Sequence, residues 1–365
     1  MNKRIRILFT ISNFNTAGSG KVVYDLVSGL DKNKFDVEIA CGSDEGDFFK
    51  IVKALGLPIN ICKTKTPLRP YYSLIPRILK IARFYKKQNY HIIHSWEWSS
   101  DWTEVLAARF AGVKWLYTKK AMGFKSKHWK IKSYLADFII TINDEMQNYF
   151  PYKKAQELIP LGIDSEYYSP TFFGNKISSI SSNFEIITVA NLVPVKGIEV
   201  LIRALHNLND STYQLTILGD YKNDYGTELI QLVEKLNLEH QVHFKGKLLD
   251  VRQSISESNL YVIPTLNQGR KEGMPMALVE AMCMGIPVLG SDISGINYVL
   301  KEYTDLLFSP GDSKDLSLKI KNIRQMSINE RAQLGESLRD YCLTNFSMNS
   351  FIKSHELLYK RLLKR

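Results

Sequence analysis

Two carboxylates that lie eight residues apart frame the segment of the chain with the clearest chemical content. Glu272 begins the stretch EGMPMALVEAMCMGIP, and Glu280 lies inside its apolar run. Because proline suits the first turn of a helix and glycine suits its C-terminal cap, Pro275 and Gly285 predict a helix between them. The loop at Glu272 then leads into a helix N-terminus, whose free N–H groups suit a phosphate or a sugar hydroxyl. An ionised Glu280 is costly to bury without partners, so we expect hydroxyl groups to bind it.

The residues by themselves also fit a buried helix with one incidental carboxylate. The segment resembles, however, the E-x7-E signature of family 4 of the retaining glycosyltransferases, which share the GT-B fold: an α/β architecture of two facing Rossmann-like domains with a cleft between them. The match continues through the flanks, YVIPTLNQGRKEGMPMALVEAMCMGIPVLGSDISGI, in strand–loop–helix–strand order. The resemblance implies that Glu272 lies by the donor sugar and that Glu280 holds the ribose hydroxyls of the nucleotide. It also places four further residues at the donor: Gly273, Met274, Pro275 and Met276.

Lys196 is the second catalytic candidate. The stretch NLVPVKG follows a predicted strand and resembles the family segment G-R-L-x-x-x-K-G, in which Arg and Lys together neutralise the departing diphosphate. Lys196 matches the family lysine, whereas Asn191 stands in place of the arginine. A neutral amide supplies no full charge, so we expect either weaker phosphate binding or replacement of the missing cation by Arg270 or Lys271. A solvated turn lysine is the alternative interpretation of Lys196.

A glycine loop, TAGSGK, lies between the first predicted strand and the first predicted helix. It does not fit the Walker A motif, because Asn15 and Val22 stand where that motif needs Gly and Ser or Thr. It does not fit G-x-G-x-x-G either. It resembles the family's N-terminal glycine loop before a helix of the type DLVSGL, which implies that a donor phosphate contacts Gly18. A simple strand–helix turn is the alternative.

Strand ends supply the remaining candidates, because ligands of open parallel sheets bind at the carboxyl ends of the strands. The resemblance places Gly219 and Asp250 near the donor nucleotide. Lys120 stands where many relatives have the histidine of a T-x-H motif, and His94 ends a predicted strand. We list both as acceptor-side candidates, although a strand-end histidine such as His94 can equally be structural.

Composition excludes several classes of protein. The chain has 365 residues, which predicts two or three domains of roughly 150 residues each. No apolar run approaches the roughly 20 residues that span a bilayer, and the N-terminus lacks the long apolar core of a signal peptide. The four cysteines are widely spaced and fit free core thiols in a reducing cytoplasm. We find no metal-ligand spacing of His, Cys and Asp, and therefore expect no metal.

The positive charge of the chain is uneven. Residues 1–170 hold 26 Lys and Arg against 16 Asp and Glu, a net of +10, whereas residues 171–365 hold 22 against 21. The densest basic stretch lies within residues 114–132 and includes three aromatic residues. Such a mixture favours an anionic membrane surface, with a solvated face or a nucleic acid as alternatives. We expect the membrane and no nucleic acid. The stretch contains Lys114, Trp115, Lys119, Lys120, Phe124, Lys125, Lys127, Trp129, Lys130 and Lys132.

Alternating strand and helix patterns predict a parallel sheet with helices on both faces in each half of the chain. The Ser-rich, aperiodic stretch that separates the halves reads as an interdomain linker. We predict an acceptor-binding domain over residues 1–165, a linker over 166–183 and a nucleotide-sugar-binding domain over 184–345. The resemblance implies that a terminal helix over 346–365 crosses back onto the first domain.

These observations predict a metal-independent transfer of a sugar from a nucleotide-diphosphate donor, with UDP the expected nucleotide, to a glycan or lipid-linked acceptor in cell-surface polysaccharide synthesis. The resemblance implies retention at the anomeric carbon and a Glu272 that orients the donor. We expect a cytoplasmic protein, peripheral at the inner membrane face. Two alternatives stay open: a nucleotide-sugar epimerase, and a non-catalytic partner of the same fold. Leu161 is a further departure, because IPLGID resembles the family segment IPNG[VI]D with Leu161 in place of Asn. The departures at Lys120, Leu161 and Asn191 favour the partner, whereas the intact Lys196, Glu272 and Glu280 favour the enzyme.

Overall fold

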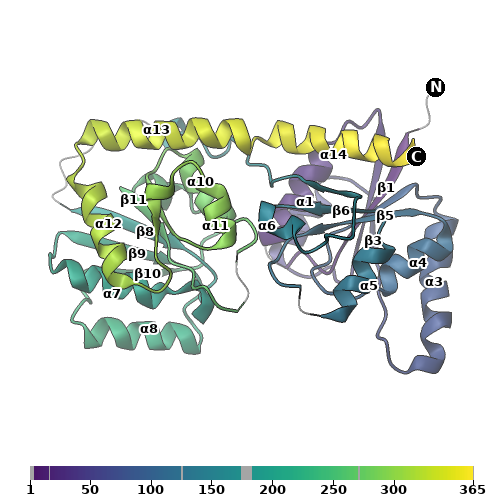
Figure 1. Cartoon of the computed structure of the whole chain (residues 1–365), viewed down its shortest axis with the longest axis horizontal. Helices are drawn as coiled ribbons and strands as arrows, with labels where there is room; N and C mark the ends of the chain where they lie inside the picture. The colour runs from purple at the N-terminus through teal and green to yellow at the C-terminus, as the bar shows by residue number, and fades with distance from the viewer. Residues whose placement is uncertain (1–3, 16, 125, 174–182, 270–271, 365) are drawn as a thin grey trace. The chain divides into compact units, whose positions relative to one another are not determined.

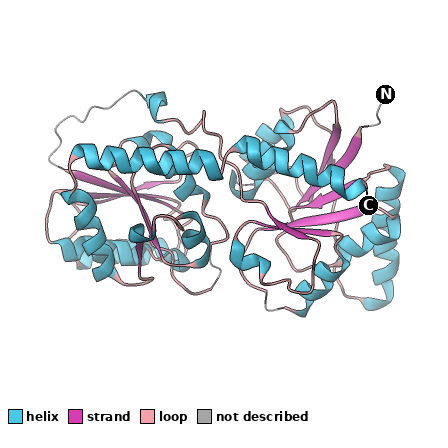
Figure 2. Cartoon of the chain, turned by 45° about the horizontal axis from the view of Figure 1, so that its top comes forward, coloured by secondary structure: helices cyan, strands magenta, loops and turns pink. Residues whose placement is uncertain are grey.

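The computed structural model of the chain describes residues 4–15, 17–124, 126–173, 183–269 and 272–364. The chain divides into two compact units (Figure 1). The first comprises residues 1–162 and 348–365, and the second comprises residues 163–347. Figure 2 shows that helices cover the strands of each unit on both faces, as expected for parallel sheets built from alternating strands and helices.

The first unit contains a seven-stranded sheet with the order β3-β2-β1-β4-β5-β6-β7. Every strand pair in it is parallel. The strand order reverses between β1 and β4, so the loops after these two strands open at the topological switch point, where such sheets bind ligands. The strands are β1 (Ile5–Ile11), β2 (Phe35–Cys41), β3 (Ile59–Ile61), β4 (Ile92–Ser95), β5 (Lys114–Lys119), β6 (Phe138–Thr141) and β7 (Gln156–Leu158).

The helices of the first unit bury apolar side chains at helical spacing against this sheet. In α3, for example, Leu74, Ile78, Ala82 and Tyr85 are buried and share one face. The helices are α1 (Ala17–Gly29), α2 (Asp47–Lys53), η1 (Tyr71–Ser73), α3 (Leu74–Lys87), α4 (Thr103–Ala111), α5 (Lys127–Leu135), α6 (Asp144–Gln147) and α14 (Met348–Leu363).

The last helix, α14, completes the core of the first unit. The ring of Tyr359 packs edge-on against Phe9 of β1 and Phe35 of β2, with centroids 6.4 and 5.9 Å apart. On α1, Gly29 makes room for Ile352, because a Cβ on Gly29 would lie 2.1 Å from the Ile352 Cδ1 atom. The C-terminal segment therefore belongs to the same unit as β1.

The second unit contains a six-stranded parallel sheet with the order β10-β9-β8-β11-β12-β13, and its switch point lies between β8 and β11. The strands are β8 (Phe184–Val189), β9 (Tyr213–Leu218), β10 (Val242–Gly246), β11 (Leu260–Ile263), β12 (Val288–Ser291) and β13 (Leu307–Phe308). The helices are η2 (Pro170–Phe173), η3 (Pro194–Lys196), α7 (Ile198–Leu208), α8 (Asp224–Lys235), α9 (Arg252–Ser256), α10 (Met276–Cys283), α11 (Ser294–Val299), η4 (Thr304–Leu306), α12 (Ser313–Gln325) and α13 (Ile328–Asn345).

The predicted fold class, two Rossmann-like units with parallel sheets, is confirmed. The sequence patterns missed the short helix α2 and three short edge strands. These strands, β3, β7 and β13, contain two or three residues each, too few to show a period of two.

The expected boundaries between the domains differ from the observed division. The first unit ends at residue 162, and residues 163–173 belong to the second unit. Ile163 donates its N–H to the Phe346 carbonyl at 2.8 Å. Tyr168 is buried, and its carbonyl accepts a hydrogen bond from Arg339 at 3.1 Å. Residues 166–173 of the expected linker are thus held in place by packing, while residues 174–182 of it lie outside the described part of the chain.

Candidate functional site

Lys196 and Glu272 meet at the switch point of the second sheet. Lys196 ends η3 in the loop after β8, and Glu272 lies in the loop after β11; these two strands are neighbours in the sheet. The Lys196 ammonium forms an ion pair with Oε1 of Glu272. The two side chains keep 23% and 17% of their surface exposed, respectively. The two catalytic candidates are therefore in contact, and both still reach the surface.

Close backbone contacts hold the two loops together. Leu266 donates its N–H to the Val195 carbonyl at 2.8 Å. Gly197 has a φ of +64°, and a Cβ there would lie 2.2 Å from the Pro264 carbonyl oxygen, so no larger residue fits. Likewise, a Cβ on Gly295 of α11 would lie 2.4 Å from the Glu272 carbonyl oxygen. Two glycines in separate segments, Gly197 and Gly295, thus help to position the ion pair, and spacing along the chain does not reveal this.

The helix predicted after Glu272 is present as α10, and its predicted ends are confirmed. Pro275 occupies the N-cap position, and Gly285 has a φ of +72° just beyond the C-terminus. Within the described residues, the backbone N–H groups of Met276 and Ala277 have no hydrogen-bond acceptor. Such free N–H groups are what a helix N-terminus that binds an anion requires.

Glu280 lies half-buried on α10, and a buried tyrosine connects it with Glu272. Burial raises the pKa of the Tyr261 hydroxyl, and the carboxylates of Glu280 and Glu272 raise it further. The Tyr261 hydroxyl donates to the Val189 carbonyl at 3.4 Å. The charges of both carboxylates therefore influence the same Tyr261 hydroxyl. Tyr261 was not among the predicted residues, since it reads as an ordinary core aromatic of a strand.

The three other donor-side candidates differ in their surroundings. Asn191 is exposed in the loop after β8. A Cβ on Gly219 would lie 2.1 Å from the Ala190 carbonyl oxygen, which brings the loops after β8 and β9 together. The Asp250 carboxylate is paired with the Arg252 guanidinium at 2.6 Å. The contact between Asp250 and a nucleotide base stays a prediction, and Arg270 and Lys271, the suggested replacements for the missing arginine, lie outside the described residues.

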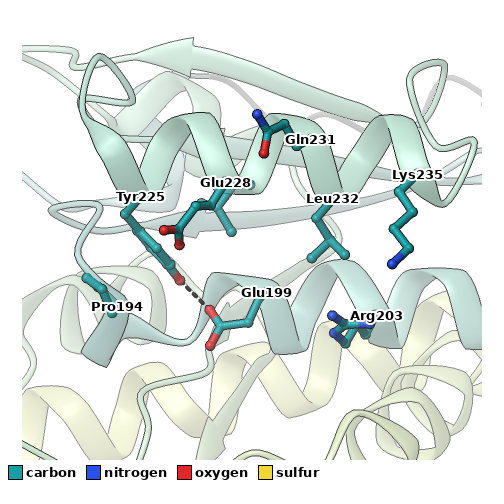
Figure 3. A pocket seen from close by; sticks show the side chains of 9 residues that line it. Pro194, Glu199, Arg203, Tyr225, Glu228, Gln231, Leu232 and Lys235 are labelled. Atoms are coloured by element: carbon teal, nitrogen blue, oxygen red, sulfur yellow. Dashed lines mark hydrogen bonds between the residues drawn. The ribbon is translucent and has the colours of Figure 1, made fainter.

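A cavity of about 410 Å³ lies beside η3, between α7 and α8 (Figure 3). Tyr225 of α8 points toward α7 and donates its hydroxyl to the Glu199 carboxylate, while the same oxygen accepts the Ile198 N–H at 2.9 Å. These contacts fasten the first turn of α7 immediately after Lys196. The lining mixes both signs of charge, so we assign the cavity a structural role in holding the Lys196 loop.

Gly18, the candidate of the N-terminal glycine loop, lies exposed near the start of α1. Its φ of −1° and ψ of −117° interrupt the helix that the surrounding residues form. The loop therefore turns at the predicted glycine, and its contact with a phosphate stays a prediction.

The acceptor-side prediction for His94 is wrong, because its side chain is fully buried in the first unit. Its Nδ1 atom lies 2.7 Å from the Tyr359 hydroxyl and its Nε2 atom 2.9 Å from Thr118 Oγ1. The ring stacks on His355 with centroids 5.6 Å apart. Burial lowers the pKa of His94 well below its usual value, with His355 and Lys120 as further causes. The alternative, a structural strand-end histidine, is the correct interpretation.

Lys120 is half-buried next to a charged pair, and its contact with an acceptor stays a prediction. Lys65 Nζ contacts Oε2 of Glu97 at 2.5 Å, and the Ser12 hydroxyl donates to the same oxygen at 2.7 Å. Ser12 and Glu97 follow β1 and β4, the two strands at the switch point. Lys120 Nζ lies 5.8 Å from the centroid of the Trp96 ring and makes no hydrogen bond to any described residue. Burial lowers its pKa to about 8, while Glu97 opposes the change.

Two lysines of the stretch 114–132 do not contribute to the expected basic surface. Lys119 and Lys132 are buried. The Lys132 ammonium donates to the Ser99 carbonyl at 2.9 Å and lies 5.0 Å from the centroid of the Tyr117 ring. The Lys119 ammonium lies 4.2 Å from the centroid of the Trp129 ring. These lysines fold inward because aromatic faces and carbonyl groups stabilise their charge. Lys119 and Lys132 are therefore removed from the predicted basic surface, whereas Lys127 and Lys130 are exposed and Lys125 lies outside the described residues. Membrane binding by this stretch stays a prediction.

Two searches of the described residues gave no further site. No cluster of three or more His, Cys, Asp or Glu side chains is arranged to hold a metal ion within the described ranges. Among the same residues, no helix combines the length and the apolar character needed to cross a bilayer.

Two parallel-sheet units with an E-x7-E helix at the second switch point define a GT-B glycosyltransferase. Two family models match adjoining parts of the chain: Glycosyltransferase Family 4 over residues 16–167, and Glycosyl transferases group 1 over residues 174–340. The chain therefore belongs to the family 4 glycosyltransferases, with the GT-B fold.

Solved structures share the fold over the whole chain. A glycosyltransferase from Rickettsia africae superposes with a TM-score of 0.86 at 16% identity and covers 100% of both chains. Alr3699/HepE from Anabaena, solved in complex with UDP and glucose, has a TM-score of 0.80 at 18% identity, over 97% of this chain and 98% of that one.

Among curated proteins, an Escherichia coli UDP-Gal:alpha-D-GlcNAc-diphosphoundecaprenol alpha-1,3-galactosyltransferase is 24% identical over 350 residues, which cover 82% of this chain and 86% of that protein. The putative colanic acid biosynthesis glycosyltransferase WcaL of Escherichia coli K12 is 27% identical over 187 residues. This second match spans about half of each protein, 49% of this chain and 45% of WcaL.

Proposed function

We propose that this protein transfers a sugar from a nucleotide-diphosphate sugar, with UDP as the nucleotide, to a glycan or lipid-linked acceptor in the synthesis of a cell-surface polysaccharide. The observation that carries the proposal is the contact between Lys196 and Glu272 at the switch point of the second sheet. The names of the relatives support the choice of donor and acceptor, since one uses UDP-galactose with a diphosphate-linked lipid and another was solved with UDP and glucose.

The donor half of the reaction follows from the charges at this switch point. The bond between the anomeric carbon and the diphosphate breaks, and the leaving diphosphate gains negative charge. Lys196 and the open N–H groups at the start of α10 offset that charge without a metal ion. The diphosphate replaces the Glu272 carboxylate as the partner of Lys196, and Glu272 then accepts hydroxyl groups of the donor sugar. Glu280 accepts the ribose hydroxyls from the middle of α10.

The acceptor half is assigned to the switch point of the first sheet. A hydroxyl of the acceptor attacks the anomeric carbon on the face that the diphosphate leaves, and its proton passes to the departing phosphate. This retaining outcome rests on the resemblance of the E-x7-E segment to the family. Lys65 forms an ion pair with Glu97 there, and Lys120 interacts electrostatically with the same carboxylate. These three side chains together carry one excess positive charge when both lysines are protonated. This excess fits an acceptor with a phosphate or carboxylate group.

Calorimetry with a panel of UDP- and GDP-sugars tests the donor, and NMR of the product tests the configuration of the new bond. Tight binding of one UDP-sugar, followed by a product with the donor's own anomeric configuration, is the expected result. If no nucleotide sugar binds to the wild-type protein, the transferase assignment fails and a non-catalytic partner of the same fold replaces it.

A further inference from the structure

The longest stretch of the chain without an acidic residue lies in the first unit. Residues 48–96 contain ten Lys and Arg and no Asp or Glu. This segment includes η1 and α3, which Figure 1 shows at the edge of the first unit beside α4. The excess of positive charge is therefore concentrated in residues 48–96. In the stretch 114–132, by contrast, Lys114 forms an ion pair with Asp137, and Lys119 and Lys132 are buried.

Helix α3 has one buried face and one exposed face. The buried face packs into the core cluster of the first unit, together with Val105, Trp115 and Tyr117. The exposed face carries four cations, none of which forms an ion pair with a described residue. They occupy the second half of the helix: Lys80, Arg83, Lys86 and Lys87.

Exposed apolar residues lie at the beginning of the same helix. Tyr72 keeps 89% of its surface exposed and Tyr71 keeps 67%, and Ile75 is exposed one turn further on. Arg77 holds this end in shape, because its guanidinium donates to the carbonyls of Pro70 at 2.9 Å and of Ser73 at 3.2 Å. Two tyrosines are thus presented on a fixed turn beside a row of cations.

We propose that η1 and α3 form a docking surface for an anionic lipid bilayer. We call this set of residues, Tyr71, Tyr72, Ile75, Lys80, Arg83, Lys86 and Lys87, the α3 surface. Tyrosine is favoured at the boundary between lipid headgroups and acyl chains, and a helix with one cationic face binds anionic headgroups. The excess of positive charge complements lipid phosphates, and the exposed apolar residues give a reason for a bilayer over a soluble polyanion. The proposal goes beyond the transfer reaction and does not depend on the donor.

Flotation with vesicles of phosphatidylcholine, with or without phosphatidylglycerol, tests the proposal on the full chain. The wild-type protein is expected to float with the anionic vesicles at low salt and not with neutral ones, and added salt weakens the binding. The variant Arg83→Gln/Lys86→Gln/Lys87→Gln is expected to lose at least about tenfold in partitioning to the anionic vesicles. Tyr72→Ser is expected to weaken binding to the same vesicles.

Matched variants on the second unit control for net charge and apolar area. Lys301→Gln/Lys314→Gln/Lys321→Gln removes the same charge from exposed positions, and Leu318→Ser removes an exposed apolar side chain. Both controls are expected to float like the wild type. Equal losses in the two triple variants, or full binding by the α3 triple variant, would overturn the proposal. So would binding of the wild type to RNA in a gel shift without any binding to vesicles.

Donor binding separates this proposal from the proposed function. The α3 variants are expected to bind the nucleotide sugar as the wild type does, because the donor candidates other than Gly18 lie on the second unit. An unchanged circular dichroism spectrum and melting temperature show that the first unit of these variants is folded. Vesicle binding by a protein that binds no nucleotide sugar would leave the α3 surface in place and remove only the transferase assignment.

Discussion

The ammonium of Lys196 and the carboxylate of Glu272 form an ion pair between residues that lie 76 positions apart in the chain. Their two loops leave neighbouring parallel strands on either side of the switch point. A cation and a carboxylate at one switch point can bind both parts of a sugar diphosphate. The cation binds the phosphate, and the carboxylate accepts hydrogen bonds from the sugar hydroxyls.

Substitutions of the two carboxylates of the E-x7-E segment are expected to have different effects, one on the rate of sugar transfer and the other on UDP binding. Glu272→Gln removes the charge that competes with a diphosphate for Lys196, so UDP affinity is expected to stay equal or rise, while the rate of transfer falls about 100-fold. Glu280→Ala is expected to weaken UDP binding itself. Calorimetry with UDP and initial rates with the identified donor measure the two effects. A fall in UDP affinity with Glu272→Gln would contradict the assigned partner exchange.

Asn191 offers a gain-of-function experiment. Asn191→Arg restores the cation that the family has at this position, and the exposed loop accommodates it. We expect several-fold tighter binding of UDP, because a second cation near the diphosphate adds charge-assisted hydrogen bonds. The control Asn322→Arg adds the same charge at an exposed position of α12. If both variants change UDP affinity equally in calorimetry, the effect is one of net charge and not of position 191.

Gly295 is expected to be intolerant of even one methyl group. Gly295→Ala places a Cβ 2.4 Å from the Glu272 carbonyl oxygen, so the loop with Glu272 must move. We expect a fall in transfer of at least about tenfold, because catalytic groups lose rate with small misplacements. Ser294→Ala, on the same helix, is the matched control. A Gly295→Ala protein with wild-type rates and an unchanged melting temperature would show that the contact does not position Glu272.

The pH dependence of acceptor binding tests Lys120. Its pKa is lowered to about 8 by burial, so its ammonium is present below that pH and lost above it. The KM for an anionic acceptor is therefore expected to rise as the pH increases through about 8 in the wild type. Lys120→Arg keeps the charge and is expected to remove this rise, and the exposed Lys127→Arg is expected to leave it. A rise that persists in Lys120→Arg would exclude Lys120 from acceptor binding.

Burial of His355 predicts a loss of stability in acid. Its pKa falls from 6.5 to about 4 in the folded chain because burial disfavours the charged ring. The unfolded chain therefore binds a proton first, so this contribution is complete above pH 6.5 and is lost as the pH falls toward 4. The full loss is roughly 3 kcal/mol of unfolding free energy. Denaturant unfolding at pH 8 and pH 5 measures about 2 kcal/mol of this loss, because pH 5 lies between the two pKa values.

His355→Phe removes the titrating group while it keeps an aromatic ring against His94. The difference in unfolding free energy between pH 8 and pH 5 is expected to shrink in this variant. The exposed His240→Asn is the control and is expected to retain the full difference. An undiminished difference in His355→Phe would assign the acid sensitivity to other groups.

Much of the fold could be predicted from local patterns. The alternation of strand and helix periods, the proline and glycine around α10 and the aperiodic stretch after the first half each leave a signal within a short window. Strands of two or three residues leave none, and β3 was missed for that reason. Among the site residues, Glu272, Glu280 and Lys196 were found because a family pattern surrounds them. Tyr261 and Gly295 were missed because their partners are remote in sequence.

Burial explains the errors in the predicted surface. The lysines of 114–132 look like a solvated basic face, yet Lys119 and Lys132 turn inward onto aromatic rings and carbonyl groups. His94 looks like a strand-end ligand, yet α14 covers it with Tyr359. A sequence lists the charges without showing which are enclosed, because enclosure depends on neighbours that the chain supplies much later.

The sequence by itself indicated the class of this protein, because the E-x7-E segment resembles a family signature and because the helix caps and the alternating elements leave signals within short windows. Only the tertiary structure decided which residues meet. The pairing of strands β8 and β11 brings Lys196 to Glu272, and the pairing of β1 and β4 brings Ser12 to Glu97. Tertiary packing also decided that the cations of α3 face solvent while Lys119 and Lys132 are enclosed, because a helix exposes the face that finds no apolar partner.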